Sequence, residues 1–234
     1  MEKRLVKVWD IPTRLFHWLL VALVAAAFLT GFDVGGSFGE IHKTIGLAVV
    51  GLLAFRIVWG FVGSTYARFT QFVPGPGRVF AYLRGQWHEL GHNPLGAFSV
   101  LALLTLTLIQ VVSGLFASGE NGSFTPPLNA LVSSATSDAF TGFHARFGWW
   151  LVAAIVCLHV ASIVFYAVVK KHFLLPAMFT GRAETDDADA QDARGGGWLA
   201  FVVAVVIAVA VVWVADGGLN PPPPPMPEQT APAW

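Results

Sequence analysis

Residues 144–169 read HARFGWWLVAAIVCLHVASIVFYAVV, a run of mostly apolar side chains. A helix needs about 20 such residues to cross a bilayer, so this run is long enough to span a membrane. It contains two histidines, His144 and His159, which are fifteen positions apart. At about 100° and 1.5 Å per residue, they lie about 60° apart around the helix axis and about 22 Å apart along it. We therefore expect one helix to present two imidazoles in similar directions at two depths.

The whole chain has the composition of a membrane protein. Of its 234 residues, 55% are hydrophobic and only 12% are charged, and one small soluble core could not bury that much apolar surface. Five runs are long enough to span a bilayer: residues 15–32, 45–62, 95–117, 147–169 and 198–215. The predicted fold is an all-α membrane protein with a four-helix transmembrane bundle plus a fifth C-terminal transmembrane helix. The first run could also be a cleaved signal peptide, but its length and its histidine favour an anchor.

Charge and cysteine content exclude several function classes. The 14 basic and 14 acidic residues cancel, so nothing in the net charge indicates a nucleic-acid partner. The single cysteine, Cys157, excludes an internal disulfide and the C-x-x-C-H signature of covalently attached haem. Any haem would therefore be bound non-covalently. We expect Cys157 itself to be a small core residue.

The basic residues predict the orientation of the spans. Eleven of the fourteen lysines and arginines precede the first span or lie in the second and fourth connections. Because short cytoplasmic connections are enriched in these residues, we expect the N-terminus in the cytoplasm and, after five spans, the C-terminus on the outer side.

Composition also divides the chain into segments. Residues 1–182 contain the four-helix unit, and within them residues 68–92 are amphipathic enough to include a short helix on the membrane surface. Residues 183–197 are acidic and glycine-rich, so they predict a flexible cytoplasmic linker to the fifth helix at residues 198–216. Residues 217–234 form a proline-rich tail.

Four histidines in or beside the spans are candidate haem ligands. Two imidazoles complete the coordination of a b-type haem iron, so His17, His42, His144 and His159 could hold two haems. The topology places His42 at the depth of His144, and His17 in the same half of the bilayer as His159. We expect an outer haem between the first pair and an inner haem between the second, inside the bundle. The alternative is that the histidines are interfacial and bind water or headgroups. That reading is weakest for His159, which lies deep in an apolar helix.

Three basic residues are candidate partners of haem propionates. Arg56 lies fourteen residues beyond His42, which places it about 21 Å deeper on nearly the same helix face, close to the inner haem. Its guanidinium could bind a propionate, or it could snorkel to the cytoplasmic surface. Lys43 and Arg146 could serve the outer propionates in the same way.

Five motifs resemble those of the bacterial cytochrome b561 and Ni-Fe hydrogenase cytochrome b family. RLFHWLL begins at residue 14, HKTIGL at residue 42, FRIVWGFVGS at residue 55, GHNPLGA at residue 91 and HARFGWWLVAAIVCLH at residue 144. The resemblance covers residues 7–182. It implies a di-haem cytochrome b of the bacterial inner membrane whose axial ligands match the four histidines above. His92, in GHNPLGA, has no ligand role in this reading, with contact to a proton path or a quinone as an alternative.

The resemblance implies that the chain transfers electrons across the membrane between the quinone pool and a redox partner such as a c-type cytochrome. One alternative is the membrane-anchor cytochrome b subunit of a hydrogenase-like oxidoreductase, with a catalytic subunit as partner. Another is a self-contained superoxide or quinone oxidoreductase. From a different class, a haem-free transporter or scaffold would use the histidines for protons or metal. Whether the chain is itself an enzyme stays open at this point.

Overall fold

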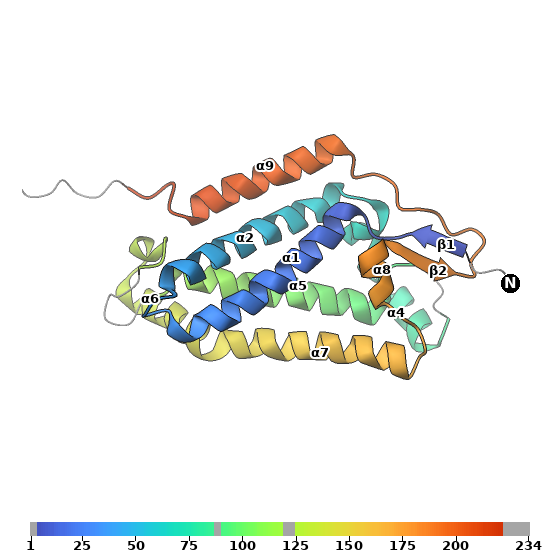
Figure 1. Ribbon diagram of the computed structural model, residues 1–234, viewed down its shortest axis with the longest axis horizontal. Helices are drawn as coiled ribbons and strands as arrows, with labels where there is room; N and C mark the ends of the chain where they lie inside the picture. Colours follow the sequence, from blue (N-terminus) through green and yellow to red (C-terminus); the bar gives the residue numbers. More distant parts are fainter. Residues whose placement is uncertain (1–3, 87–89, 119–124, 222–234) are drawn as a thin grey trace, which may run out of the picture.

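Five long helices lie side by side in the computed structural model, which describes residues 4–86, 90–118 and 125–221 (Figure 1). They are α1 (Ile11–Thr30), α2 (Gly39–Val62), α5 (Pro94–Phe116), α7 (Trp149–Val168) and α9 (Trp198–Ala215). Each belongs to a helical segment long and apolar enough to cross a membrane. The expectation of an all-α membrane protein with five spans is confirmed.

Shorter elements connect these helices. The strands are β1 (Arg4–Lys7) and β2 (Arg182–Thr185), and the short helices are η1 (Gly31–Asp33), η2 (Thr65–Ala67), α3 (Phe69–Phe72), α4 (Pro76–Leu83), η4 (Asn129–Leu131), α6 (Ser134–Thr141), the π-helix η5 (Gly142–Gly148) and α8 (Leu175–Thr180). The strands lie at one end of the bundle, here called the sheet end, and α6 lies at the other, the α6 end (Figure 1).

Two helix starts are determined by local sequence. The Asp10 side chain accepts a hydrogen bond from the backbone N–H of Thr13 at 2.7 Å, and it caps α1. Asn93 caps α5 in the same way, with its Oδ1 2.8 Å from the backbone nitrogen of Gly96. A proline follows each cap in the first turn, where its missing N–H costs nothing.

The fifth helix packs along α2 (Figure 1). Ala204 and Ala208 of α9 are buried in one core cluster with Phe55 and Trp59 of α2. At Gly51 the approach is so close that an added Cβ would lie 2.9 Å from Cγ2 of Val212. Small residues on both helices allow this approach. The fifth helix is therefore packed into the core of the protein along one side.

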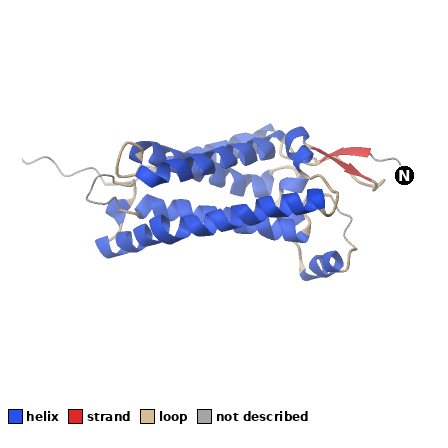
Figure 2. Ribbon diagram, turned by 60° about the horizontal axis from the view of Figure 1, so that its bottom comes forward, coloured by secondary structure: helices blue, strands red, loops and turns tan. Residues whose placement is uncertain are grey.

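The stretch expected to be a flexible linker, residues 183–197, is instead held against the sheet end. Strand β2 pairs antiparallel with β1, with Arg4 opposite Thr185 and Lys7 opposite Arg182, beside the N-terminus (Figure 2). Farther along, the backbone nitrogen of Ala193 donates to the Lys7 oxygen at 2.7 Å. These backbone hydrogen bonds order a segment whose composition alone favours disorder.

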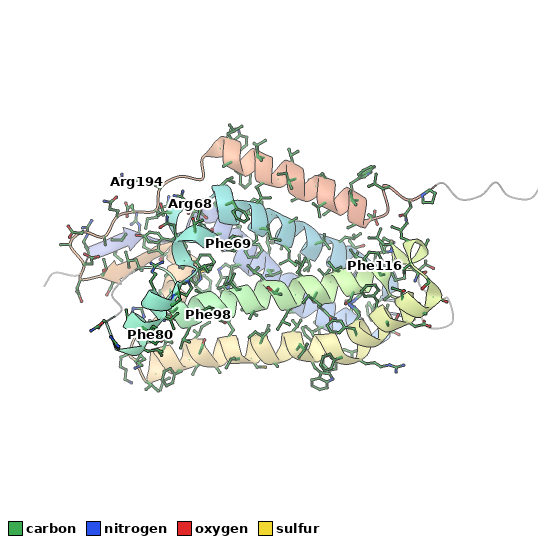
Figure 3. All side chains as sticks on the ribbon, turned by 180° about the vertical axis from the view of Figure 1, so that it is seen from behind. Arg68, Phe69, Phe80, Phe98, Phe116 and Arg194 are labelled. Atoms are coloured by element: carbon green, nitrogen blue, oxygen red, sulfur yellow. The ribbon has the colours of Figure 1, made fainter. Side chains whose placement is uncertain are left out.

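Three smaller expectations have different outcomes. The amphipathic segment does form short helices, α3 and α4, and Phe80 projects from α4 with 61% of its surface exposed (Figure 3). Cys157 was expected in the core, but it is exposed on α7. Of the proline-rich tail, residues 222–234 lie outside the described residues.

Candidate functional site

His42 and His144 face each other at the α6 end of the bundle. His42 is in the first turn of α2 and His144 is in the π-helix η5, which leads into α7. Their ring centroids are 6.1 Å apart, with the ring planes at 80°. Imidazole–metal bonds are about 2 Å long, so a metal bound by one nitrogen of each ring requires centroids about 6 Å apart. The spacing of this pair fits such a metal.

Hydrogen bonds orient both rings by their Nδ1 atoms. The Thr30 hydroxyl donates to the backbone oxygen of Ala26 at 2.8 Å, so its oxygen is available to accept from Nδ1 of His42, 3.0 Å away. Nδ1 of His144 lies 2.8 Å from the backbone oxygen of Gln110, which can only accept. Both rings therefore carry their proton on Nδ1, and Nε2 is left as the atom that can bind a metal.

Glycines make room for the two rings. A Cβ at Gly114 of α5 would lie 2.6 Å from Cε1 of His144, which is closer than real Cβ atoms approach. A Cβ at Gly31 would lie 3.4 Å from Cε1 of His42, which is close to ordinary contact. The absence of a side chain at Gly114 is therefore a condition for the observed position of His144.

His17 and His159 form a looser pair toward the sheet end. His17 is on α1 and His159 on α7, and the two are close enough to interact electrostatically. Within the described part of the chain they do not make the ring contact seen between His42 and His144. Nδ1 of His17 is buried without a hydrogen-bond partner. The structure thus brings the predicted pair to one region of the bundle and leaves the imidazoles apart.

Arg56 lies inside the protein near the sheet end. Its side chain is only 3% exposed, which contradicts the alternative that it snorkels to the surface. Its guanidinium carbon lies 6.0, 5.1 and 5.9 Å from the ring centroids of Phe16, Phe69 and Phe72. Nη2 donates to the backbone oxygen of Ala67 at 3.2 Å, whereas Nη1 is buried without a partner. A buried cation with a free donor suits an anionic ligand.

The other two candidate cations lie nearer the surface. Lys43 forms an ion pair with Glu40, one turn earlier in α2. Arg146 is exposed on the π-helix, two positions after His144. Neither side chain is held against the His42–His144 pair by a contact in the described structure.

His92 was not among the predicted site residues, but it packs on the same Phe72 ring as Arg56. Its ring packs between Trp9 and Phe72, with centroids 4.7 and 4.8 Å away, and its Nδ1 is buried without a partner. Burial, followed by the positive charges of Arg56 and His159, lowers the pKa of His92 to about 3. His92 belongs to the motif GHNPLGA, and Asn93 of the same motif caps α5.

The His42–His144 pair has the spacing that two axial ligands of one haem iron need. Among the residues that the structure describes, no three histidine, cysteine or acidic side chains gather into a group able to hold a metal by themselves. A haem iron needs only two, because the porphyrin supplies the other four. The His42–His144 spacing, the free Nε2 atoms of this pair and the unpartnered nitrogen of the buried Arg56 fit a haem with a bound propionate.

Comparisons with known proteins identify related sequences. A family model described as prokaryotic cytochrome b561 matches residues 8–181. A probable Ni/Fe-hydrogenase 1 B-type cytochrome subunit of Escherichia coli (strain K12) is 23% identical over 211 residues, which cover 74% of this chain and 88% of that protein. A probable Ni/Fe-hydrogenase B-type cytochrome subunit of Rhizobium leguminosarum bv. viciae is 26% identical over 220 residues, covering 77% and 90%. No solved structure matches significantly.

Proposed function

Because the chain belongs to the prokaryotic cytochrome b561 family, we propose that it carries electrons across the membrane through two b haems, each held by one histidine pair. The family assignment and the five spans make it a multi-pass bacterial membrane cytochrome b that transfers electrons. Our proposal adds to this that one chain holds two haems, one at each histidine pair. The observation that carries it is the His42–His144 pair, whose ring centroids are 6.1 Å apart.

The chain's own residues supply the binding sites. His42 and His144 would ligate the outer haem, and His17 and His159 the inner one. Haem b supplies an iron that gains and loses one electron, at a potential set by its axial ligands and surroundings. The hydrogen bonds to Nδ1 of His42 and His144 hold both rings in place for ligation. The apolar bundle keeps water away from the path between the two sites.

Basic residues would bind the haem propionates. Arg56 is the proposed partner at the inner haem, because it is buried and has an unpartnered nitrogen. Lys43 and Arg146 are the corresponding candidates at the outer haem, since each adjoins a ligand of the outer pair in sequence. Lys43 would have to exchange its contact with Glu40 for one with a propionate.

The electron donor and acceptor belong to the same proposal. The names of the relatives favour a hydrogenase-like catalytic subunit as redox partner, with a c-type cytochrome as the other candidate. The quinone pool would take or supply electrons within the membrane. The distribution of lysine and arginine supports a cytoplasmic N-terminus and an outer, periplasmic C-terminus. The sheet end would then face the cytoplasm and the α6 end the outer side.

Haem quantification tests the proposal. The protein is purified in detergent, its reduced-minus-oxidised spectrum is recorded, and haem per chain is measured as pyridine haemochrome. Two b haems per polypeptide are expected. One haem would contradict the two-site arrangement, and a colourless protein after haem-supplemented expression would contradict haem binding altogether. Reduction of the haems by a quinol analogue, with and without added hydrogenase subunits, then tests the partners.

A further inference from the structure

Among the residues that the structure describes, two buried nitrogens near the inner histidine pair have no hydrogen-bond partner. One is Nη1 of Arg56, and the other is Nδ1 of His92. They come from different parts of the chain: Arg56 is in the last third of α2, and His92 comes directly before the residue that caps α5. Buried polar groups are nearly always hydrogen-bonded, so two unpartnered nitrogens in one region indicate a missing partner, and Nη1 of Arg56 requires that partner to be an acceptor.

The two side chains share one aromatic neighbour. The Phe72 ring centroid is 5.9 Å from the guanidinium carbon of Arg56 and 4.8 Å from the ring centroid of His92. His92 also lies within electrostatic reach of Arg56 and of His159, the proposed inner ligand. Arg56, His92 and His159 therefore approach a common region from α2, the start of α5 and α7.

Among the residues that the structure describes, no acidic side chain is hydrogen-bonded to Nη1 of Arg56. Asp10 is the acidic residue whose charge reaches Arg56. However, its Oδ1 accepts from the backbone nitrogen of Thr13 at 2.7 Å, and its Oδ2 accepts from Nε1 of Trp59 at 3.0 Å. Both oxygens thus have their own donors. A buried guanidinium without a close anionic partner is costly, which makes a bound carboxylate the expected partner.

We propose that His92 is a cofactor-binding residue that acts with Arg56 to bind one propionate carboxylate of the inner haem. Arg56 donates through Nη1 and His92 through Nδ1–H. A neutral imidazole has one N–H to donate, and the packing of its ring between Trp9 and Phe72 holds that donor in place. This inference rests on the proposed function, because it requires a haem between His17 and His159.

A second carboxylate source has to be distinguished in the test. His92 also lines a cavity of about 330 Å³ at the sheet end, together with Tyr66, Asp187 and Asp189. A small soluble carboxylate could enter there. The position of His92 within electrostatic reach of both Arg56 and His159 favours the propionate, because those residues lie on the inner-haem side.

The test compares His92→Phe with His92→Gln. Phenylalanine keeps an aromatic ring between Trp9 and Phe72 but removes the donor, whereas glutamine keeps a donor. With the propionate charge less compensated, the oxidised, more positive haem is favoured, so His92→Phe should shift the inner-haem potential downward and His92→Gln should restore it. Infrared redox difference spectra with ¹³C-labelled propionates should show a shifted carboxylate band in His92→Phe alone. His172→Phe, at an exposed loop histidine, is the control.

Two results would overturn the inference about His92. An unchanged potential and an unchanged carboxylate band in His92→Phe would overturn the inference. So would a potential that responds to added acetate in the wild type but not in His92→Phe, because the pair would then bind a soluble carboxylate. The outer haem, measured in the same samples, reports whether each variant is folded. If His159→Ala retains both haems, the ligand assignment fails instead, and this result is separate from the first two.

Discussion

Gln110 and His144 bind each other through both main chain and side chain. The backbone oxygen of Gln110 lies 2.8 Å from Nδ1 of His144, and Nε2 of Gln110 donates to the backbone oxygen of His144 at 3.0 Å. Gln110 thus holds both the imidazole ring and the backbone of His144 in place. His144 lies in a π-helix, a distortion that often occurs at functional sites. The side-chain amide of Gln110 donates its hydrogen bond to a carbonyl of this π-helix.

The Gln110→Leu variant tests the role of this residue in holding His144. Loss of the amide leaves the His144 oxygen without its side-chain donor, at a cost of about 1–3 kcal/mol. The variant keeps the backbone oxygen that binds Nδ1 of His144 and loses only the bond that positions the His144 backbone, so the outer haem should bind more weakly by about 10-fold, the lower end of the range for partners of metal ligands. Haem titration into the apoprotein measures the effect. The inner haem of the same sample is the control, and equal weakening of both haems would indicate general damage.

Alanine substitutions of the histidines test the pairing. His42→Ala and His144→Ala should each remove the outer haem and spare the inner one, because a six-coordinate haem needs both imidazoles. His17→Ala and His159→Ala should do the reverse. Redox titration shows which of the two potentials disappears. Loss of the same haem from His42→Ala and His159→Ala would contradict the assignment, and His172→Ala should change neither.

Two glycines form a matched pair for steric tests. Gly114→Ala places a methyl group 2.6 Å from Cε1 of His144, so the ring must move and the outer haem should lose occupancy or become high-spin. Gly31→Ala places a methyl group 3.4 Å from Cε1 of His42, a distance that a small shift can relieve. Electron paramagnetic resonance of the oxidised protein distinguishes the two results. Identical low-spin spectra in both variants would mean that Gly114 does not constrain His144.

The burial of Arg56 predicts an effect on the inner haem. A nearby cation disfavours the oxidised, more positive haem, so Arg56→Leu should lower the inner potential. Arg56→Lys should retain part of the effect, because it keeps the charge but loses the bidentate donor geometry. Arg146→Leu, at an exposed site near the outer pair, should leave the inner potential unchanged. If Arg56→Leu leaves the inner-haem potential unchanged, Arg56 does not interact with the inner haem.

The contact between α2 and α9 can be tested at Gly51. Gly51→Leu inserts a side chain where even a Cβ lies 2.9 Å from Val212, so overpacking should cost about 1–3 kcal/mol. Thermal unfolding in detergent measures the loss. Adding Val212→Ala should recover part of it by making space. If the double variant is as unstable as the single one, the destabilisation does not arise from this contact.

The positions of the spans and the relative depths of the histidines follow from the amino-acid sequence alone. A span depends on the length of an apolar run, and the depth of a residue depends on its position along a helix, so both can be calculated without knowing the neighbouring helices. For the same reason the sequence could pair His42 with His144 by depth, and the two rings meet in the structure. It could also identify Arg56 as a charge in an apolar helix that needs a partner.

The contacts between segments far apart in the chain become visible only in the folded protein. Strand β1, at residues 4–7, pairs with β2, at residues 182–185. Helix α9 packs on α2, and Gln110 of α5 is hydrogen-bonded to His144. The burial of Arg56 and its proximity to His92 likewise depend on how α2, α3 and α5 pack together. These relationships depend on side-chain shape and on hydrogen bonds between residues far apart in sequence. Neither helical periodicity nor composition carries that information, because both describe a segment without its neighbours.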